Sequence, residues 1–141
     1  MQPKDVARAI LEGEADAVVG CDRDGIIRFW NPGAARIFGF TAEEAVGQSL
    51  DIVIPERLRA RHWEGWRCTM ETGISRFSGG DTLSVPALCK DGTQISVEFT
   101  INMLYDDDGR ITGLVAVMRD VTTRFAELKA LRRQARSLPS P

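Results

Sequence analysis

Hydrophobic and polar positions follow two different periods along this chain. Between residues 95 and 103 apolar and polar side chains alternate, which is typical of a strand with one buried face. Shorter runs rich in β-forming residues predict four further strands, at 17–22, 26–30, 82–89 and 111–118. Turns that contain glycine follow three of the five strands, at 23–25, 90–93 and 106–110. Because proline has no N–H to give to a neighbouring strand, Pro86 places the run 82–89 at a sheet edge or at a bulge.

Helical spacing replaces the alternation between the second and third strands. An Asn-Pro pair at 31–32 and a Thr-x-x-Glu capping box at 41–44 each mark the start of a helix. We therefore expect two short helices, at about 32–38 and 42–46. Residues 47–54 then form a connector with room for one helical turn.

The longest helix of this region is expected to run from Pro55 to Met70, with Gly73 at its end. Proline suits the first turn, where its missing N–H would have no partner, and glycine suits the left-handed residue that ends a helix. Three apolar residues and the only histidine recur at every fourth position on one broad face: Leu58, His62, Trp66 and Met70. We therefore expect His62 to point the way the apolar residues point, with arginines beside it.

Amphipathic helices are expected near both ends of the chain, at 6–12 and 121–135. The order of elements predicts an α+β fold, a five-stranded antiparallel sheet with short helices on one face and flanking N- and C-terminal helices. We divide the chain into an N-terminal helix for packing or dimerisation, a core, and a C-terminal helix with its tail, at 1–13, 14–120 and 121–141. A hollow is expected between the sheet and the helix that carries His62.

Composition and charge narrow the range of partners. The 141 residues, of which 43% are hydrophobic, suffice for one domain with a core but not for two full domains. The formal net charge is −2, and the basic residues form neither a patch for nucleic acid nor an amphipathic face for membrane contact. No apolar run approaches bilayer-spanning length and no signal-peptide core is present, so we expect a cytoplasmic protein.

Motifs that carry catalytic chemistry are absent. The three cysteines are odd in number and have no C-x-x-C spacing, which argues against a disulfide framework and a zinc site. Catalytic carboxylate pairs, a nucleophile with its base, a phosphate-binding loop and an H-E-x-x-H helix are also missing. We therefore expect no enzymatic activity in this chain.

Four segments, in this order and spacing, resemble the successive signatures of PAS domains: 21–27 (CDRDGII), 29–34 (FWNPGA), 37–47 (IFGFTAEEAVG) and 119–122 (RDVT). The resemblance covers roughly residues 7–133. It implies the PAS fold and a sensory module of a bacterial-type signal-transduction protein. It also implies a homodimer, and a C-terminal output domain such as a histidine kinase or a diguanylate cyclase in the parent protein. Any enzymatic activity would belong to that domain.

In this family the segment that follows the last strand is a hinge for output. The resemblance therefore implies signal relay by Asp120, Thr122 and Arg124. Thr122 is in place to cap the exit helix, and Asp120 with Arg124 would form a switch pair. Plain capping is the structural alternative for these residues.

Residues 54–62 (IPERLRARH) resemble the segment of haem-binding PAS oxygen sensors in which a histidine binds the iron. The resemblance implies haem b held by His62, which would sense a diatomic gas or the redox state. Three residues of the same helix face would enclose the porphyrin: Leu58, Trp66 and Met70. Arg67 or Arg76 would meet its propionates.

The opposite side of such a haem departs from the family pattern. The arginine that hydrogen-bonds oxygen in those sensors corresponds to Leu83 here, and leucine cannot donate a hydrogen bond. An apolar distal side favours CO, NO or redox sensing over a long-lived oxygen complex, unless Arg76 or Trp63 reaches in. Met103 is either a distal ligand or core filling.

Two other interpretations remain open. The first is a haem-free PAS module that binds a small organic ligand or none and serves dimerisation and signal relay. The second is a redox sensor with non-covalent flavin near Trp30 and Asn102. A light-driven cysteine adduct is not expected, because residues 51–54 (DIVI) replace the Asn-Cys-Arg-Phe motif of the light-sensing branch.

Overall fold

The structure, a computed structural model, describes residues 1–74 and 84–137, the side chain of Phe125 excepted. Its α-helices and strands in chain order are α1 (Pro3–Leu11), β1 (Ala17–Asp22), β2 (Ile27–Trp30), α2 (Pro32–Phe38), α3 (Ala42–Ala45), α4 (Arg59–Thr72), β3 (Ser84–Leu88), β4 (Gln94–Tyr105), β5 (Ile111–Asp120) and α5 (Thr122–Ser137). Two short 3-10 helices, η1 (Leu50–Val53) and η2 (Glu56–Leu58), lie between α3 and α4. Within these described ranges no helix has the length and apolarity to cross a membrane.

The five strands form one antiparallel sheet in the order β2-β1-β5-β4-β3. β5 is central, and its Ala116 pairs with Val19 of β1 and Ile101 of β4. Side chains opposite each other in a ladder share a face, so these three residues lie in one row. β3 is an edge strand, which confirms the expectation drawn from Pro86.

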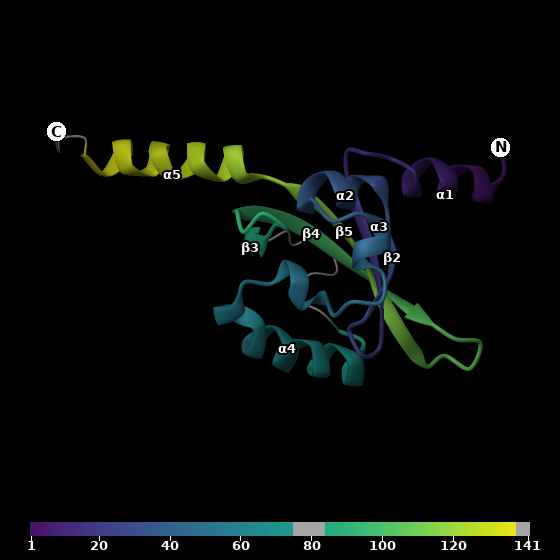
Figure 1. Ribbon diagram of the computed structural model, residues 1–141. Helices are drawn as coiled ribbons and strands as arrows, with labels where there is room; N and C mark the ends of the chain where they lie inside the picture. The colour runs from purple at the N-terminus through teal and green to yellow at the C-terminus, as the bar shows by residue number, and fades with distance from the viewer. Residues whose placement is uncertain (75–83, 138–141) are drawn as a thin grey trace.

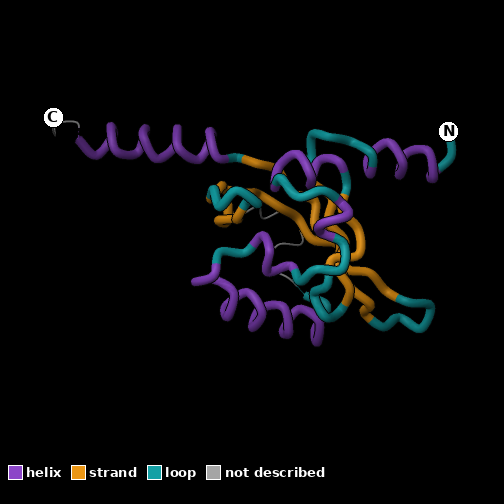
Figure 2. The backbone as a smooth tube through the Cα atoms, in the orientation of Figure 1, coloured by secondary structure: helices purple, strands orange, loops and turns teal. Residues whose placement is uncertain are grey.

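The helices between β2 and β3 cover one face of this sheet (Figures 1 and 2). Phe38 of α2 and Ala45 of α3 are fully buried. Trp66 and Met70 of α4 join the same apolar cluster as Val97 of β4. The predicted α+β arrangement, with the short helices on one face, is therefore confirmed.

The capping signals are observed where the sequence predicted them. The Asn31 side chain accepts a hydrogen bond from the N–H of Ala34 at the start of α2. Thr41 and Glu44 form a reciprocal capping box at the start of α3. Gly73 ends α4 with a positive φ of 72°, a conformation that costs glycine little.

The helix expected from Pro55 to Met70 is divided, and its predicted start was wrong. Residues Glu56–Leu58 form the 3-10 turn η2, and α4 begins only at Arg59. Pro55 precedes the turn with an extended ψ of 137°. The reason is tertiary: Pro55 and Ile54 are both buried, and this burial holds the backbone extended where local propensity alone would allow a helix.

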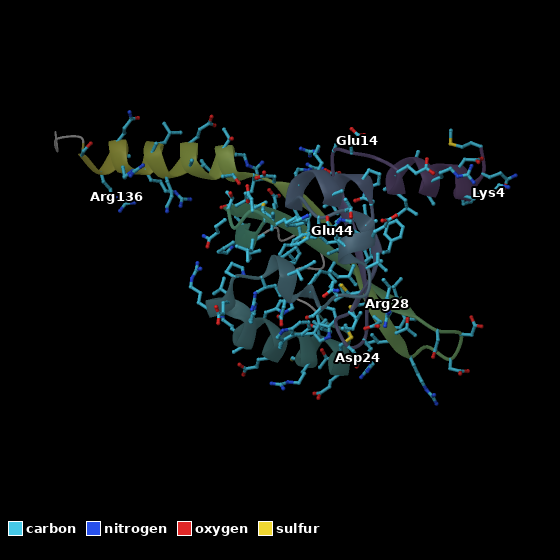
Figure 3. The ribbon with its side chains drawn as sticks, in the orientation of Figure 1. Lys4, Glu14, Asp24, Arg28, Glu44 and Arg136 are labelled. Atoms are coloured by element: carbon cyan, nitrogen blue, oxygen red, sulfur yellow. The ribbon has the colours of Figure 1, made fainter. Side chains whose placement is uncertain are left out.

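The two terminal helices extend away from the sheet on opposite sides, as the labelled residues Lys4 and Arg136 show (Figures 1 and 3). α1 starts at Pro3, earlier than expected, because the Asp5 carboxylate accepts the N–H of Gln2 there. No residue of α1 is buried. Its apolar face is therefore available to another surface.

Candidate functional site

His62 lies on α4 and has one ring nitrogen without a partner. Its side chain is half-buried, and its Nδ1 is buried and makes no hydrogen bond. Buried polar atoms in folded proteins nearly always have a hydrogen-bond partner. An orphaned ring nitrogen therefore marks a place where a ligand would find unused bonding capacity.

Two indoles of the same helix pack against the His62 imidazole. The ring centroid of Trp63 lies 4.6 Å away with an interplanar angle of 82°, and that of Trp66 lies 5.9 Å away. Burial lowers the pKa of His62 below its usual value, and the nearby Asp51 carboxylate opposes this shift. The imidazole is therefore neutral at pH 7, which is the form that ligates metal ions.

The same two tryptophans attach α4 to the β1–β2 turn and to η1. The Trp63 indole N–H donates to Asp51 Oδ1 at 2.7 Å. The Trp66 indole N–H donates to the carbonyl of Arg23 at 2.9 Å. Sequence analysis missed Asp51 and gave Trp63 no anchoring role. The sequence signal for this anchoring role was Trp63 itself, which directly follows His62. From that position its ring reaches a neighbouring element.

Apolar side chains on the inner face of the sheet are incompletely covered. Ile101 and Met103 of β4 and Ala116 of β5 pack against the core yet are only partly buried. The inner face of central strands is normally closed by the opposing layer. These residues therefore offer apolar surface to a ligand.

The residues predicted to surround a ligand lie in different environments. Trp66 and Met70 are buried in the core, Leu58 is half-buried, and Arg67 is exposed to solvent. Arg76 and Leu83 lie outside the described residues. Of the predicted set, α4 therefore brings His62, Trp66 and Met70 together on its inner side, as the four-residue spacing indicated.

A family model described as the PAS fold matches residues 7–121. The chain belongs to the PAS family. Among solved structures it is similar to the PAS domain of a protein from Colwellia psychrerythraea, with a TM-score of 0.73 and 25% sequence identity. That match covers 85% of this chain and 97% of the other, which confirms the predicted PAS fold.

Two curated relatives are sensor proteins. The oxygen sensor protein DosP of Escherichia coli is 30% identical over 122 residues, which cover 86% of this chain and 15% of DosP. The sensor protein FixL of Bradyrhizobium diazoefficiens is 33% identical over 122 residues, which cover 82% of this chain and 22% of FixL. The chain is thus a PAS sensory domain that spans less than a quarter of either relative.

The exit from the PAS core is held by polar contacts that differ from the predicted ones. The Asp120 carboxylate accepts the N–H of Thr122 at 2.9 Å. The Thr122 hydroxyl accepts the N–H of Ser96 at 3.0 Å instead of capping its own helix. Arg124 pairs with Glu98 of β4, where the expected partner was Asp120. Thr122 and Arg124 bond to residues of β4 because this strand runs beside the start of α5.

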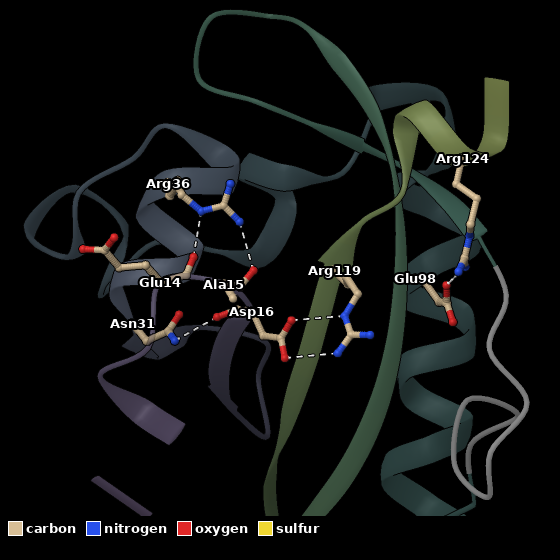
Figure 4. A network of polar contacts seen from close by, with 8 residues as sticks. All are labelled: Glu14, Ala15, Asp16, Asn31, Arg36, Glu98, Arg119 and Arg124. Atoms are coloured by element: carbon tan, nitrogen blue, oxygen red, sulfur yellow. Dashed lines mark hydrogen bonds and ion pairs between the residues drawn. The ribbon is translucent and has the colours of Figure 1, made fainter. Parts of the chain in front are cut away.

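The connector between α1 and β1 is fixed by a second set of contacts (Figure 4). The Arg36 guanidinium donates to the carbonyls of Glu14 and Ala15 at 2.7 and 2.9 Å. Asp16 forms an ion pair with Arg119 of β5. Arg36, Arg119 and Arg124 all line an open hollow of about 610 Å³ beside the start of α5. The entry and exit of the PAS core therefore meet on one side of the domain.

The two residues predicted to hold flavin lie on opposite faces of the sheet. The Trp30 indole N–H donates to the carbonyl of Phe40 at 2.9 Å, and the ring is only 4% exposed. Asn102 is exposed and alternates along β4 with the inward-facing Ile101 and Met103. The predicted pairing of Trp30 with Asn102 around a flavin is therefore wrong, because strand alternation turns Asn102 to the outer face.

Cysteine and carboxylate chemistry is limited in the described part of the chain. Cys21, Cys68 and Cys89 are free thiols. Burial raises the pKa of Cys21 to about 12, so this thiol is protonated and inert at neutral pH. Residues 1–74 and 84–137 contain no group of three His, Cys, Asp or Glu side chains placed to hold a metal ion. A single histidine is the donor that a haem iron requires from one side.

Proposed function

We propose that this PAS domain binds haem b through His62 and senses a diatomic gas or the redox state. The observation that carries the proposal is the buried Nδ1 of a neutral imidazole, which has no hydrogen-bond partner. The inner side of α4 also carries the buried Trp66 and Met70. The relation to the oxygen sensor DosP supports the same reading.

The sheet carries apolar side chains that fit a large, flat, hydrophobic group. Ile101 and Met103 of β4 are partly buried against the core, and ligand sites are lined predominantly by apolar side chains. Exposed Arg67 is a candidate partner for the propionates. Haem, when bound, supplies an iron centre that takes up a diatomic ligand or changes oxidation state.

Each residue of the site has a separate part in this proposal. His62 supplies the nitrogen that holds the iron, and its lowered pKa keeps it unprotonated. Trp66 and Met70 are buried and would keep water away from the bound group. Met103 of β4, partly buried against the core, would be a second candidate ligand through its thioether sulfur.

The test is the absorption spectrum of the protein after incubation with haemin and removal of excess. We expect a Soret band in the wild type and its loss or displacement in His62→Ala. Cys68→Ser is the matched control, because Cys68 is exposed on the same helix and its thiol is the competing ligand there. We expect this variant to keep the wild-type spectrum.

Two results would contradict the proposal. The first is a wild-type protein that takes up no haem. The second is a His62→Ala spectrum identical to that of the wild type. A Soret band that is lost in Cys68→Ser and kept in His62→Ala would show that the Cys68 thiolate, and not His62, binds the haem iron.

We further propose that the domain relays its signal through α5 to an output domain of a longer protein, such as a histidine kinase or a diguanylate cyclase. The chain covers only a small share of DosP and FixL, which supports a place in a larger protein. Asp120, Thr122 and Arg124 are the relay residues, since they tie the start of α5 to the sheet. In this proposal the domain has no catalytic activity of its own.

A second function, homodimerisation through α1, is favoured by the exposure of that helix. Val6 is 44% and Ile10 58% exposed, and a nine-residue helix with no buried residue is marginal in water on its own. A second copy would cover this face, and this role needs no haem. Deletion of residues 1–13 should shift the protein toward monomer in sedimentation experiments, while an unchanged oligomeric state would exclude α1 from the interface.

A further inference from the structure

The indole of Trp63 is fixed at both of its ends. At one end its N–H donates to Asp51 of η1 at 2.7 Å. At the other end the six-membered ring lies on Gly25 of the β1–β2 turn, where an added Cβ would stand 2.2 Å from Trp63 Cη2. Only a residue without a side chain allows this contact. Trp63 is therefore held between two elements that precede α4 in the chain.

The turn that receives Trp63 is itself held in place. The Arg23 carbonyl accepts the indole N–H of Trp66 at 2.9 Å, and the Arg23 guanidinium donates to the carbonyl of Ile111 at 3.1 Å. Ile111 is the first residue of β5. The β1–β2 turn is thus hydrogen-bonded to the central strand of the sheet. It therefore provides a fixed surface on which Trp63 packs.

The His62 imidazole rests on this fixed indole. The two rings meet edge to face, with centroids 4.6 Å apart and an interplanar angle of 82°, the geometry that aromatic pairs favour. Nδ1 has no hydrogen-bond partner, so no hydrogen bond at that atom orients the ring. The orientation is set by packing, and Trp63 provides the nearer of the two indoles.

We propose that Trp63, itself fixed on the β1–β2 turn, is the positioning residue of the site and holds the His62 imidazole in the orientation that meets a ligand. The proposal rests on the function proposed above, in which His62 binds the ligand. Hydrogen-bond partners that orient a metal-binding histidine typically contribute 10–100-fold to metal affinity, and we expect an effect of this order from an indole that orients the ring by packing. They do so because a correctly aimed ring loses less freedom on binding.

The first experiment follows the ring protons of His62 by NMR in the haem-free protein at pH 8. His62 is the only histidine, so its ring resonances need no further assignment. Asp51→Ala removes the acceptor of the Trp63 N–H, whereas Asp51→Asn keeps an oxygen that accepts it. We expect the His62 resonances and their NOEs to Trp63 to change in Asp51→Ala and to be retained in Asp51→Asn. In Trp63→Leu, where the indole itself is gone, we expect the NOEs between the His62 ring and Trp66 to change.

The second experiment uses two matched glycines. Gly25 and Gly109 both have φ +79° and close turns with the same hydrogen bonds, from Gly25 N–H to Asp22 and from Gly109 N–H to Asp106. A Cβ at Gly109 meets nothing within 4 Å. Both alanine variants carry the same backbone strain, so only the contact with Trp63 separates them. We expect Gly25→Ala to move the His62 resonances and Gly109→Ala to leave them in place.

The haem affinity gives the functional readout. We expect it to fall roughly tenfold or more in Asp51→Ala and Trp63→Leu, and to stay within about twofold of wild type in Asp51→Asn. If the wild type takes up no haem, the proposed function fails, and the NMR comparison still decides whether Trp63 orients the ring. Unchanged NOEs between the His62 ring and Trp66 in Trp63→Leu, or a changed His62 ring orientation with unchanged haem affinity, would overturn the positioning role.

Discussion

Arg119 and Asp16 form a bidentate ion pair that joins the end of β5 to the connector before β1. Arg119 Nε lies 3.1 Å from Asp16 Oδ1, and Arg119 Nη2 lies 3.3 Å from Asp16 Oδ2. The pair is exposed, with 68% of the Arg119 side chain accessible to solvent. Its effect on stability is therefore small, and its geometry matters more for keeping the entry to the domain beside its exit.

Arg119→Lys should lower the free energy of unfolding by less than about 1 kcal/mol, because exposed ion pairs contribute little. Lysine keeps the charge but cannot form both parallel hydrogen bonds. Urea denaturation at low salt measures the change, and the difference should shrink in 1 M salt. A loss above about 2 kcal/mol would show that the pair acts as a buried one.

Asn31→Ala should destabilise the domain by about 3 kcal/mol or more. The Asn31 side chain is 1% exposed and makes four hydrogen bonds, accepting from the N–H groups of Val18 and Ala34 and donating to the carbonyls of Gly13 and Asp16. Alanine leaves these buried groups unpaired. Chemical denaturation provides the measurement.

The matched control for Asn31 is Asn102→Ala, an exposed asparagine on the outer face of β4. We expect it to change the free energy of unfolding by no more than about 0.5 kcal/mol. Equal effects at the two positions would show that the four side-chain hydrogen bonds of Asn31 carry no special weight.

The sequence predicted those parts of the fold that depend on local signals. Asn31, the Thr41 capping box and Gly73 fix the ends of helices through contacts within a few residues, so their spacing was sufficient. The alternation along β4 was equally local. The backbone conformation of Pro55 was predicted wrongly, because proline can adopt either an extended or a helical ψ. Only the burial of its side chain in the assembled domain decides between the two.

Only those features of the candidate site that follow from residue spacing along the sequence were predicted. The four-residue spacing placed His62, Trp66 and Met70 on one side of α4. The contact of Trp63 with Gly25 joins positions far apart in the sequence, and no local pattern encodes it. The partner of Arg124 was missed for the same reason, since Glu98 reaches it only after β4 and the start of α5 come together.

Gly33→Ala should destabilise the domain by more than about 2 kcal/mol, whereas Gly65→Ala should stabilise it by about 1 kcal/mol. A Cβ at Gly33 would lie 1.9 Å from the backbone oxygen of Asp16, so two backbone segments must separate. Gly65 is exposed within α4 and a Cβ there meets nothing, so alanine adds helix propensity alone. Thermal denaturation of both variants tests the pair, and a stabilised Gly33→Ala would contradict the close approach.

Below about pH 6.5 the haem-free domain should lose stability through His62. Burial lowers the pKa of His62 in the folded state, so the unfolded chain binds a proton that the folded chain does not. The contribution is therefore complete above the ordinary histidine pKa and is lost as the pH falls from there through the lowered folded value. His62→Gln removes the only histidine, so its free energy of unfolding should vary less between pH 7.5 and 5.5 than that of the wild type. Urea titrations across this range measure the difference, and a wild-type curve parallel to that of the variant would mean that the imidazole is as well solvated in the folded domain as in the unfolded chain.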